Sequence, residues 1–194
     1  MIKVIHVISD TNIGGAGRVL LNYLQYTNKQ DFSTAVALPR GSLLTQPLRA
    51  LGATVYEVEG LVDRSYHKDD VRTLMELIRT VDPDIVHTHG ALSGRIAARF
   101  SGVPVVYSRH SAFPVPAKIK YPPGRWANKL INEFFADHII AVSPATRDNL
   151  TEGGISEKKI TVVMNGVAPV EETTPEQRKA LKAELGIPED ACVF

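Results

Sequence analysis

The fold of this chain is decided by residues 2–17, IKVIHVISDTNIGGAG. The first half of this stretch is apolar and β-branched, which is typical of a strand buried on both faces. Gly14, Gly15 and Gly17 follow, and a helical pattern occupies 18–26. A strand that passes through glycines into a helix leaves main-chain N–H groups unpaired at the helix N-terminus, where the helix dipole favours an anion. The stretch predicts either a phosphate-binding loop or a tight turn without a ligand.

The alternation of strand and helix continues along the chain. The predicted strands are 34–38, 54–58, 85–88, 103–107, 139–142 and 160–163, and the predicted helices are 45–51, 69–81, 90–100, one from 143 and 175–185. Asp69 and Asp70 are expected to cap one helix and Ser143 another. Most strands are apolar on both faces, so the predicted fold class is α/β, a doubly wound parallel sheet with helices on both faces. Ligands of such sheets bind beyond the carboxyl ends of the strands.

Composition limits the partners and the location of the protein. The 194 residues carry a net charge of +1, which argues against nucleic acid as a partner. The single cysteine, Cys192, excludes an internal disulfide framework and a cysteine-built metal site, and it fits a reducing compartment. No apolar run reaches the roughly 18 residues of a membrane-spanning helix, and no signal peptide precedes the first strand. We expect a cytoplasmic protein.

The chain changes character after residue 167. Residues 1–167 are expected to form one domain. A polar linker is expected at 168–174, a charged helix follows at 175–185, and 191–194 have the apolar character of a new strand. We interpret 168–194 as a linker, a helix and the beginning of a second domain.

Histidines follow two of the predicted strands. His87 and His89 lie on the same face by alternation, so they can share a ligand or a metal. A metal needs a third protein ligand, none is evident, and no metal is expected. For His87, a core histidine bonded to the backbone is the simpler interpretation. Arg109 and His110 follow the next strand, where together they can hold a sugar hydroxyl and a phosphate.

A segment without acidic residues extends from Asp84 to Glu133. Within it, 113–125 is predicted to be a long loop, mobile or poorly packed, rich in proline and aromatic residues. The basic and aromatic residues of the loop and its end include Lys118, Lys120, Arg125 and Trp126. Basic residues mixed with aromatic ones favour contact with an anionic membrane surface, or with an acceptor that carries phosphate or lipid.

The simpler interpretation of this segment is a solvated loop followed by a packed helix. Trp126, Leu130 and Phe134 recur at helical spacing, as the buried face of a helix does. For Trp126, packing inside the protein is the preferred interpretation.

Five motifs, in their order, resemble the N-terminal half of retaining glycosyltransferases of the GT-B fold, in family four. They are IHVISDTNIGGA at 5–16, PDIVHTHG at 83–90, SRH at 108–110, IIAVSPATRDNL at 139–150 and KITVVMNGV at 159–167. The final LGIPEDACVF, at 185–194, resembles the junction with that family's second Rossmann-like domain. The resemblance implies a Rossmann-like domain on the acceptor side of a two-domain enzyme, with a missing C-terminal domain that holds the donor nucleotide.

The resemblance also implies roles for particular residues. Gly14 and Gly15 match the loop whose backbone meets the donor diphosphate, and His110 matches a catalytic histidine beside the donor sugar. Asn12, His89 and Arg109 are candidate contacts of the acceptor or the sugar. The family often has a glutamate shortly after the glycine pair, and this chain has Gly17 and Arg18 instead, so any contact of that glutamate has no counterpart here.

The implied reaction is the transfer of a hexose from a nucleotide-sugar, UDP- or GDP-linked, with retained anomeric configuration and without a metal or other cofactor. The acceptor would be a sugar, a lipid-linked molecule or a phosphorylated one, as in the synthesis of cell-envelope polysaccharide. The implied location is cytoplasmic, peripheral at the inner face of the membrane. The two-domain reading also predicts that these 194 residues fold alone but do not turn over.

The alternative is a non-catalytic Rossmann- or flavodoxin-like module that binds a ligand or regulates a partner. A response regulator is disfavoured because the later strand ends carry histidine and arginine where it needs aspartate and lysine. A dinucleotide dehydrogenase needs G-x-G-x-x-G and an acidic residue after the second strand. The glycine loop lacks that spacing, and Leu38, Pro39 and Arg40 supply no acid.

Overall fold

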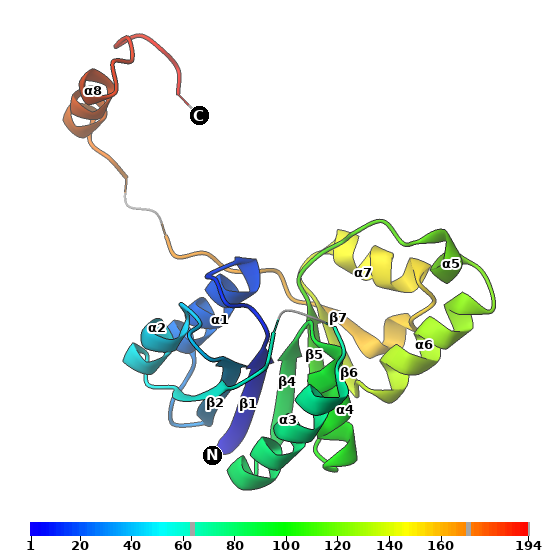
Figure 1. Cartoon of the computed structure of the whole chain (residues 1–194). Helices are drawn as coiled ribbons and strands as arrows, with labels where there is room; N and C mark the ends of the chain where they lie inside the picture. The colour runs from blue at the N-terminus through cyan, green and yellow to red at the C-terminus, as the bar shows by residue number, and fades with distance from the viewer. Residues whose placement is uncertain (63–64, 170–171, 194) are drawn as a thin grey trace.

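The computed structural model describes residues 1–62, 65–169 and 172–193, which include a seven-stranded parallel sheet (Figure 1). The strands are β1 (Ile2–Ile8), β2 (Phe32–Pro39), β3 (Thr54–Val58), β4 (Ile85–His89), β5 (Val105–Arg109), β6 (His138–Ala141) and β7 (Ile160–Val162). They lie in the order β3-β2-β1-β4-β5-β6-β7, and each neighbouring pair is parallel. The predicted Rossmann-like α/β fold class is confirmed.

Helices follow most of the strands, as the alternating pattern predicts. They are α1 (Gly15–Tyr26), α2 (Thr45–Ala50), α3 (Lys68–Val81), α4 (Leu92–Phe100), α5 (Ala117–Lys120), α6 (Gly124–Phe134), α7 (Pro144–Glu152) and α8 (Pro175–Glu184), with a 3-10 turn η1 (Glu157–Lys159) before β7. The predicted cap of α7 is confirmed, since the Ser143 hydroxyl oxygen accepts the Thr146 N–H at 3.1 Å.

The start of α3 differs from the prediction. His67 is its N-cap, and the His67 Nδ1 accepts the Asp69 N–H at 3.3 Å. Asp69 and Asp70 lie one step further on, in the first turn. Carboxylates are stabilised there by the helix dipole, so the acidic pair still marks the helix start although it does not cap it.

Helices lie on both faces of the sheet, but they cover the two faces unequally. On one face Ile5 and Val7 belong to a core that includes α3 and α4 residues. On the other face Ile8, Leu20 and Leu38 form a core with α1 and α2. On that second face, β4, β5 and β6 instead line a cavity of about 620 Å³. The uneven cover leaves one part of the sheet accessible to a ligand.

The described residues from 172 onward do not pack against the sheet and its helices. Helix α8 stands apart from the sheet in Figure 1 and buries none of its residues. The described residues 191–193 are not in a strand, which corrects the strand predicted for 191–194. A strand is stable only when it is paired, so an apolar run alone does not form one. Residues 170–171 of the predicted linker, and residue 194, lie outside the described residues.

Candidate functional site

The predicted ligand-binding residues meet at one edge of the sheet. Strand β1 leads into Gly14 and Gly15, β4 ends at His89, and His110 directly follows β5. Because β4 lies between β1 and β5, the glycine loop and His110 share the carboxyl edge with one strand between them. The strand order also reverses between β1 and β4, and ligands bind beside such a switch point. The prediction that the loop and His110 share this edge is confirmed.

The glycine loop ends in a helix start whose N-cap residue, Gly14, provides no side-chain cap. Helix α1 begins at Gly15, earlier than predicted, and its N-cap Gly14 has extended backbone with no side-chain cap and no acidic residue in the first turn. The Gly14 N–H donates to the carbonyl of Asn12 at 3.0 Å, and Asn12 is exposed. A Cβ on Gly15 would meet no heavy atom within 4 Å. The helix N-terminus is therefore accessible to an anion.

Gly17 has a different reason to be glycine. It is buried in α1, and a Cβ there would lie 2.9 Å from a methyl carbon of Leu44. That distance is too short for a carbon–carbon contact, so the third glycine allows α1 to approach Leu44, the residue before α2. Of the three glycines, Gly14 and Gly15 are placed for a ligand and Gly17 for packing.

A chain of hydrogen-bonded histidines crosses the sheet from β1 to the end of β5. The Nδ1 of His6 lies 3.0 Å from the Nε2 of His89, and the Nδ1 of His89 lies 3.0 Å from the Nε2 of His110. Their rings are nearly parallel, with centroids 5.3 Å apart for the first pair and 5.2 Å for the second. His89 thus fixes the orientation of His110. The remaining nitrogen of His110, Nδ1, is buried and has no hydrogen-bond partner within the described part of the chain.

His87 joins this group, and His6 is a member that the sequence prediction missed. The Nε2 of His87 lies 2.7 Å from the Ser108 hydroxyl on β5, so the predicted bond to the backbone is replaced by a side-chain bond. His6 and His87 are paired in register, and alternation puts both on the face of His89. His6 lies two residues before Ile8 on β1, so alternation alone places the two side chains on the same face of the strand. Which histidines lie next to His6 depends on how β1 pairs with β4, and the sequence does not show that pairing.

The environment keeps these imidazoles neutral. Burial lowers the pKa of His6 and His89 well below its ordinary value, and the positive charge of a neighbouring protonated histidine lowers it further. Burial and the charge of His110 lower the pKa of His87 to about 4. Burial alone lowers the pKa of His110. A neutral imidazole offers both an N–H donor and a lone pair, so His110 can bond a hydroxyl or a phosphate oxygen without carrying charge.

The cavity on the open face of the sheet reaches these histidines. It is bounded by His110 and Ser108 on one side and by α1 and residues 163–167 on the other. The side-chain amide of Asn22 donates to the carbonyl of Gly166 at 3.1 Å, which holds this later segment against α1. The volume of the cavity falls within the range of small-molecule binding pockets, which is roughly 300–1,000 Å³.

Arg109 is not part of the same cavity. Its Nε donates to the Ser111 carbonyl at 2.9 Å, and an Nη lies 3.5 Å from the Tyr107 hydroxyl. It lines a separate cavity of about 310 Å³, together with residues of α6 and α7. Adjacent residues of an extended segment point to opposite faces, and Arg109 and His110 accordingly line different cavities.

The predicted long loop, 113–125, contains one short helix and the start of another. Residues 117–120 form α5, and α6 begins at Gly124, whose Cβ position would overlap the Lys118 carbonyl oxygen. The Lys120 ammonium pairs with Glu152 at 2.7 Å, and an Nη of Arg125 donates to the Thr151 carbonyl at 3.3 Å. The basic residues are therefore partly engaged within the protein, and the segment predicted as a loop is helical in part.

The preferred interpretation of Trp126 is also wrong. Trp126, Leu130 and Phe134 share one face of α6, but they are 67%, 70% and 48% exposed. Helical spacing shows that side chains share a face, and it does not show that anything covers that face. None of the helices in the described ranges is long and apolar enough to cross a bilayer. The apolar face of α6 is thus available at the surface.

Comparison with known proteins agrees with the fold and the motifs. The profile of Glycosyltransferase Family 4 matches residues 13–171. A D-inositol 3-phosphate glycosyltransferase 1 of Catenulispora acidiphila is 34% identical over 123 residues, which are 58% of this chain and 29% of that protein.

Solved structures share the fold at lower identity. Alr3699/HepE of Anabaena, in complex with UDP and glucose, matches with a TM-score of 0.71 and 17% identity over 96% of this chain and 50% of its own. A glycosyltransferase of Rickettsia africae matches with a TM-score of 0.75 and 19% identity over 97% and 50%. A UDP-GlcNAc 2-epimerase of Neisseria meningitidis matches with a TM-score of 0.57 and 17% identity over 83% and 45%.

The chain spans half of the Alr3699/HepE and Rickettsia africae structures and less than a third of the curated relative. Because an epimerase shares the fold, the structural likeness establishes the Rossmann-like domain of GT-B proteins but not the reaction. The family profile covers most of the sequence, from the glycine loop to the segment after β7. The chain therefore belongs to Glycosyltransferase Family 4.

Proposed function

We propose that this chain is the acceptor-side domain of a retaining, metal-independent glycosyltransferase that moves a hexose from a UDP- or GDP-linked donor to a lipid-linked or other acceptor. One observation carries the proposal: an uncapped helix N-terminus and a histidine with an unpartnered nitrogen lie at the same edge of one sheet. Alr3699/HepE, which shares the fold, has been solved with UDP and glucose, and this supports a nucleotide-sugar donor.

The glycine loop would bind the donor diphosphate. As the sugar is transferred, the bond from its anomeric carbon to a diphosphate oxygen breaks and a bond to the acceptor oxygen forms. The proton of the acceptor hydroxyl would pass to an oxygen of the departing diphosphate. Negative charge grows on the departing diphosphate. The N–H groups at the start of α1 and the helix dipole stabilise that charge from fixed positions.

His110 would bind the transferred sugar. Its Nε2 is held by His89, so its Nδ1 has a defined direction, and it is the nitrogen left without a partner. The low pKa of His110 keeps the imidazole neutral at pH 7. Asn12, exposed in the glycine loop, is proposed as a further contact of the sugar or the acceptor, and Arg109 would contact an acceptor from its own cavity. Both ring nitrogens of His89 are taken by His6 and His110, so His89 would act on the sugar through His110.

Gly15→Ala is expected to weaken donor binding without destabilising the fold. The new methyl group meets no protein atom but stands between the diphosphate and the backbone. Loss of a hydrogen bond to a charged group costs about 1.5–3 kcal/mol, so the donor KM should rise roughly 10–100-fold. The measurement is the donor KM of a protein that joins this chain to a donor domain, together with its Tm.

Gly17→Ala is the matched control, because it adds the same methyl group to the same helix. That methyl group clashes with Leu44, so the Tm should fall while the donor KM stays unchanged. If the Gly15→Ala protein keeps the parental donor KM, the proposal that this loop binds the diphosphate is wrong.

We also propose that the enzyme works at the inner face of the membrane and docks through α6. Trp126, Leu130 and Phe134 present an apolar strip, as interfacial helices do. Lys129 and Glu133 border this strip. On α5 and at the start of α6, Lys118, Lys120 and Arg125 add basic side chains, of which Lys120 pairs with Glu152. A lipid-linked acceptor would be reached from this position.

Trp126 makes the docking directly measurable, because it is the chain's single tryptophan. Vesicles containing phosphatidylglycerol are expected to shift its fluorescence to the blue and to sediment the protein. Lys118→Glu should weaken vesicle binding about fivefold or more, since a basic residue near an anionic leaflet contributes about 1 kcal/mol.

The control changes two exposed leucines to serine, Leu181 on α8 and Leu185 directly after it. Leu130→Ser with Phe134→Ser should abolish vesicle binding, and the α8 changes should not. If anionic vesicles do not change the Trp126 fluorescence, membrane docking through α6 is contradicted. The transferase proposal would be unaffected.

A further inference from the structure

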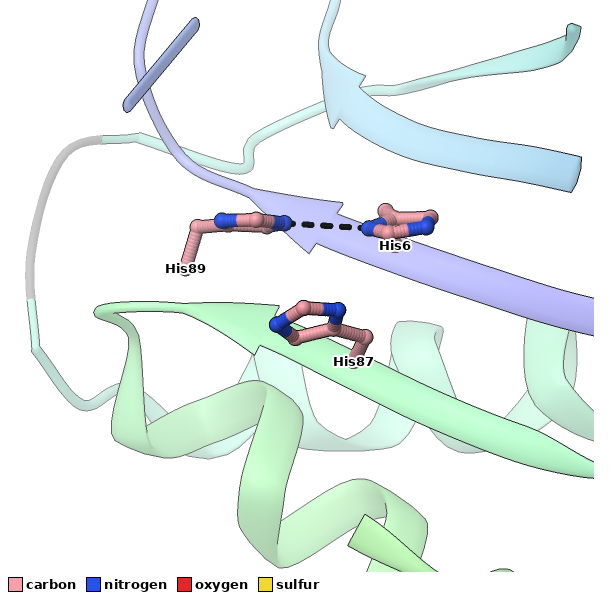
Figure 2. A group of neighbouring side chains, drawn as sticks. All are labelled: His6, His87 and His89. Atoms are coloured by element: carbon pink, nitrogen blue, oxygen red, sulfur yellow. Dashed lines mark hydrogen bonds between the residues drawn. The ribbon is translucent and has the colours of Figure 1, made fainter. Parts of the chain in front are cut away.

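We propose that His6, His87 and His89 form a binding site for a divalent transition-metal ion of the Zn²⁺ type. Figure 2 shows the three rings gathered on one face of β1 and β4. One ring nitrogen from each lies within 4.8 Å of those of the other two. Among the residues that the structure describes, this is the group of histidine, cysteine and carboxylate side chains whose spacing fits a metal ion.

The spacing suits tetrahedral coordination after small movements. Zn–N bonds of about 2.0–2.1 Å place the nitrogens of a tetrahedral site about 3.3 Å apart. The His6 and His89 nitrogens are 3.0 Å apart, slightly closer than that, and the widest separation in the group closes by side-chain rotation. The strands themselves need not move, because His6 and His87 are already in register on paired strands.

In two of the three rings, those of His87 and His89, the other nitrogen is held as metal-binding histidines require. Ser108 bonds the Nε2 of His87, and His110 bonds the Nδ1 of His89. These bonds leave the Nδ1 of His87 and the Nε2 of His89 to face the metal. Such outer partners fix the ring orientation and tautomer of ligating histidines. Burial favours the neutral imidazole, which is the form that binds a metal.

Hydrogen bonding alone does not satisfy this cluster. The Nε2 of His6 is buried and has no hydrogen-bond partner within the described residues. Three imidazoles packed together on two central strands carry this cost, and an aliphatic core would avoid it. A ligand that needs several imidazoles explains why they are there. Imidazole ligands select zinc, copper, nickel or iron over magnesium and calcium.

The cavity gives the ion its remaining coordination position. All three histidines line it, so an ion there is reached from the open face of the sheet. The ion would lie behind His110 and connect to it through His89. His89 and His110 would therefore separate the ion from the transferred sugar, and the transfer itself would remain metal-independent. The proposal does not depend on the sugar-transfer role, because a metal can bind whether or not the chain takes part in transfer.

Metal titration of the chain, made without a polyhistidine tag and stripped with EDTA, tests the site. One equivalent of Zn²⁺ should bind and raise the Tm. Co²⁺ should bind competitively and give the intense visible bands of a four- or five-coordinate centre. His87→Ala is the first variant, because His87 is only half-buried and its loss disturbs the core least.

The variants should form a graded series. Ser108→Ala removes an outer partner and should lower the Zn²⁺ affinity roughly 10–100-fold, and His87→Ala should lower it further. His138→Ala, on β6 and bonded to Thr161 outside the cluster, should change nothing. No saturable Zn²⁺ binding by the parent chain would overturn the proposal. So would equal binding by the His87→Ala and His138→Ala proteins. If His87→Ala does not fold, the parent chain and Ser108→Ala decide the question.

Discussion

Replacing His110 by alanine in a protein that joins this chain to a donor domain is expected to lower kcat about 10²–10³-fold. The imidazole is held by His89 at 3.0 Å, and its free Nδ1 is buried at the edge of the cavity. A group fixed in this way stabilises the reacting sugar without paying for reorganisation during the reaction. Alanine leaves that position empty, and water there would not be oriented in the same way.

The measurement is the initial rate of sugar transfer at saturating donor and acceptor. His138→Ala is the matched control, since it removes a histidine from the same sheet outside the site. His89→Ala should give a smaller loss of kcat, because His110 remains but is no longer oriented. If the kcat of the His110→Ala enzyme is within about threefold of the parental kcat, His110 does not stabilise the reacting sugar and another group must do so.

The sheet was predictable because its strands carry their own signal. Parallel strands covered on both faces are continuous apolar runs, as β1 is. Even the partly buried edge strand β3 was predicted, at 54–58, with the bounds that the structure gives it. Strand β2, by contrast, extends beyond its prediction to Phe32 and Pro39. Strand ends depend on pairing with a neighbour, which a single run of residues does not show.

The candidate site was only partly predictable, because it depends on pairing across the sheet. His89 and His110 could be placed from their strand ends, but His6 entered the group through its register with His87. Arg109 shows the opposite case. It is adjacent to His110 in sequence, yet alternation sends it into another cavity.

The surface of α6 was missed for a different reason. Periodicity showed that Trp126, Leu130 and Phe134 share a helix face, and the usual meaning of such a face is burial. Whether another element covers it depends on where α6 lies relative to the sheet. The structure leaves it exposed, so the same pattern that predicted packing supports a docking surface instead.

The 194-residue chain by itself is expected to fold and to show no detectable sugar transfer. Folding should succeed because three buried clusters on the sheet, built around Ile5, Ile8 and Ile139, close within residues 1–167. Cooperative thermal unfolding followed by circular dichroism would show this.

Transfer should fail because the glycine loop and His110 form only one wall of the proposed site. The chain spans half of the glycosyltransferases that it matches in structure, and the opposite wall would come from a donor domain. That wall would supply further groups for the diphosphate and, on closing, would exclude water. Each missing charge-stabilising group costs about 10²–10³ in rate, so two or more put the loss beyond about 10⁴-fold. The chain and a two-domain protein should be assayed side by side with UDP- and GDP-sugars. Comparable transfer by the two would place the whole site within these residues and contradict the two-domain mechanism.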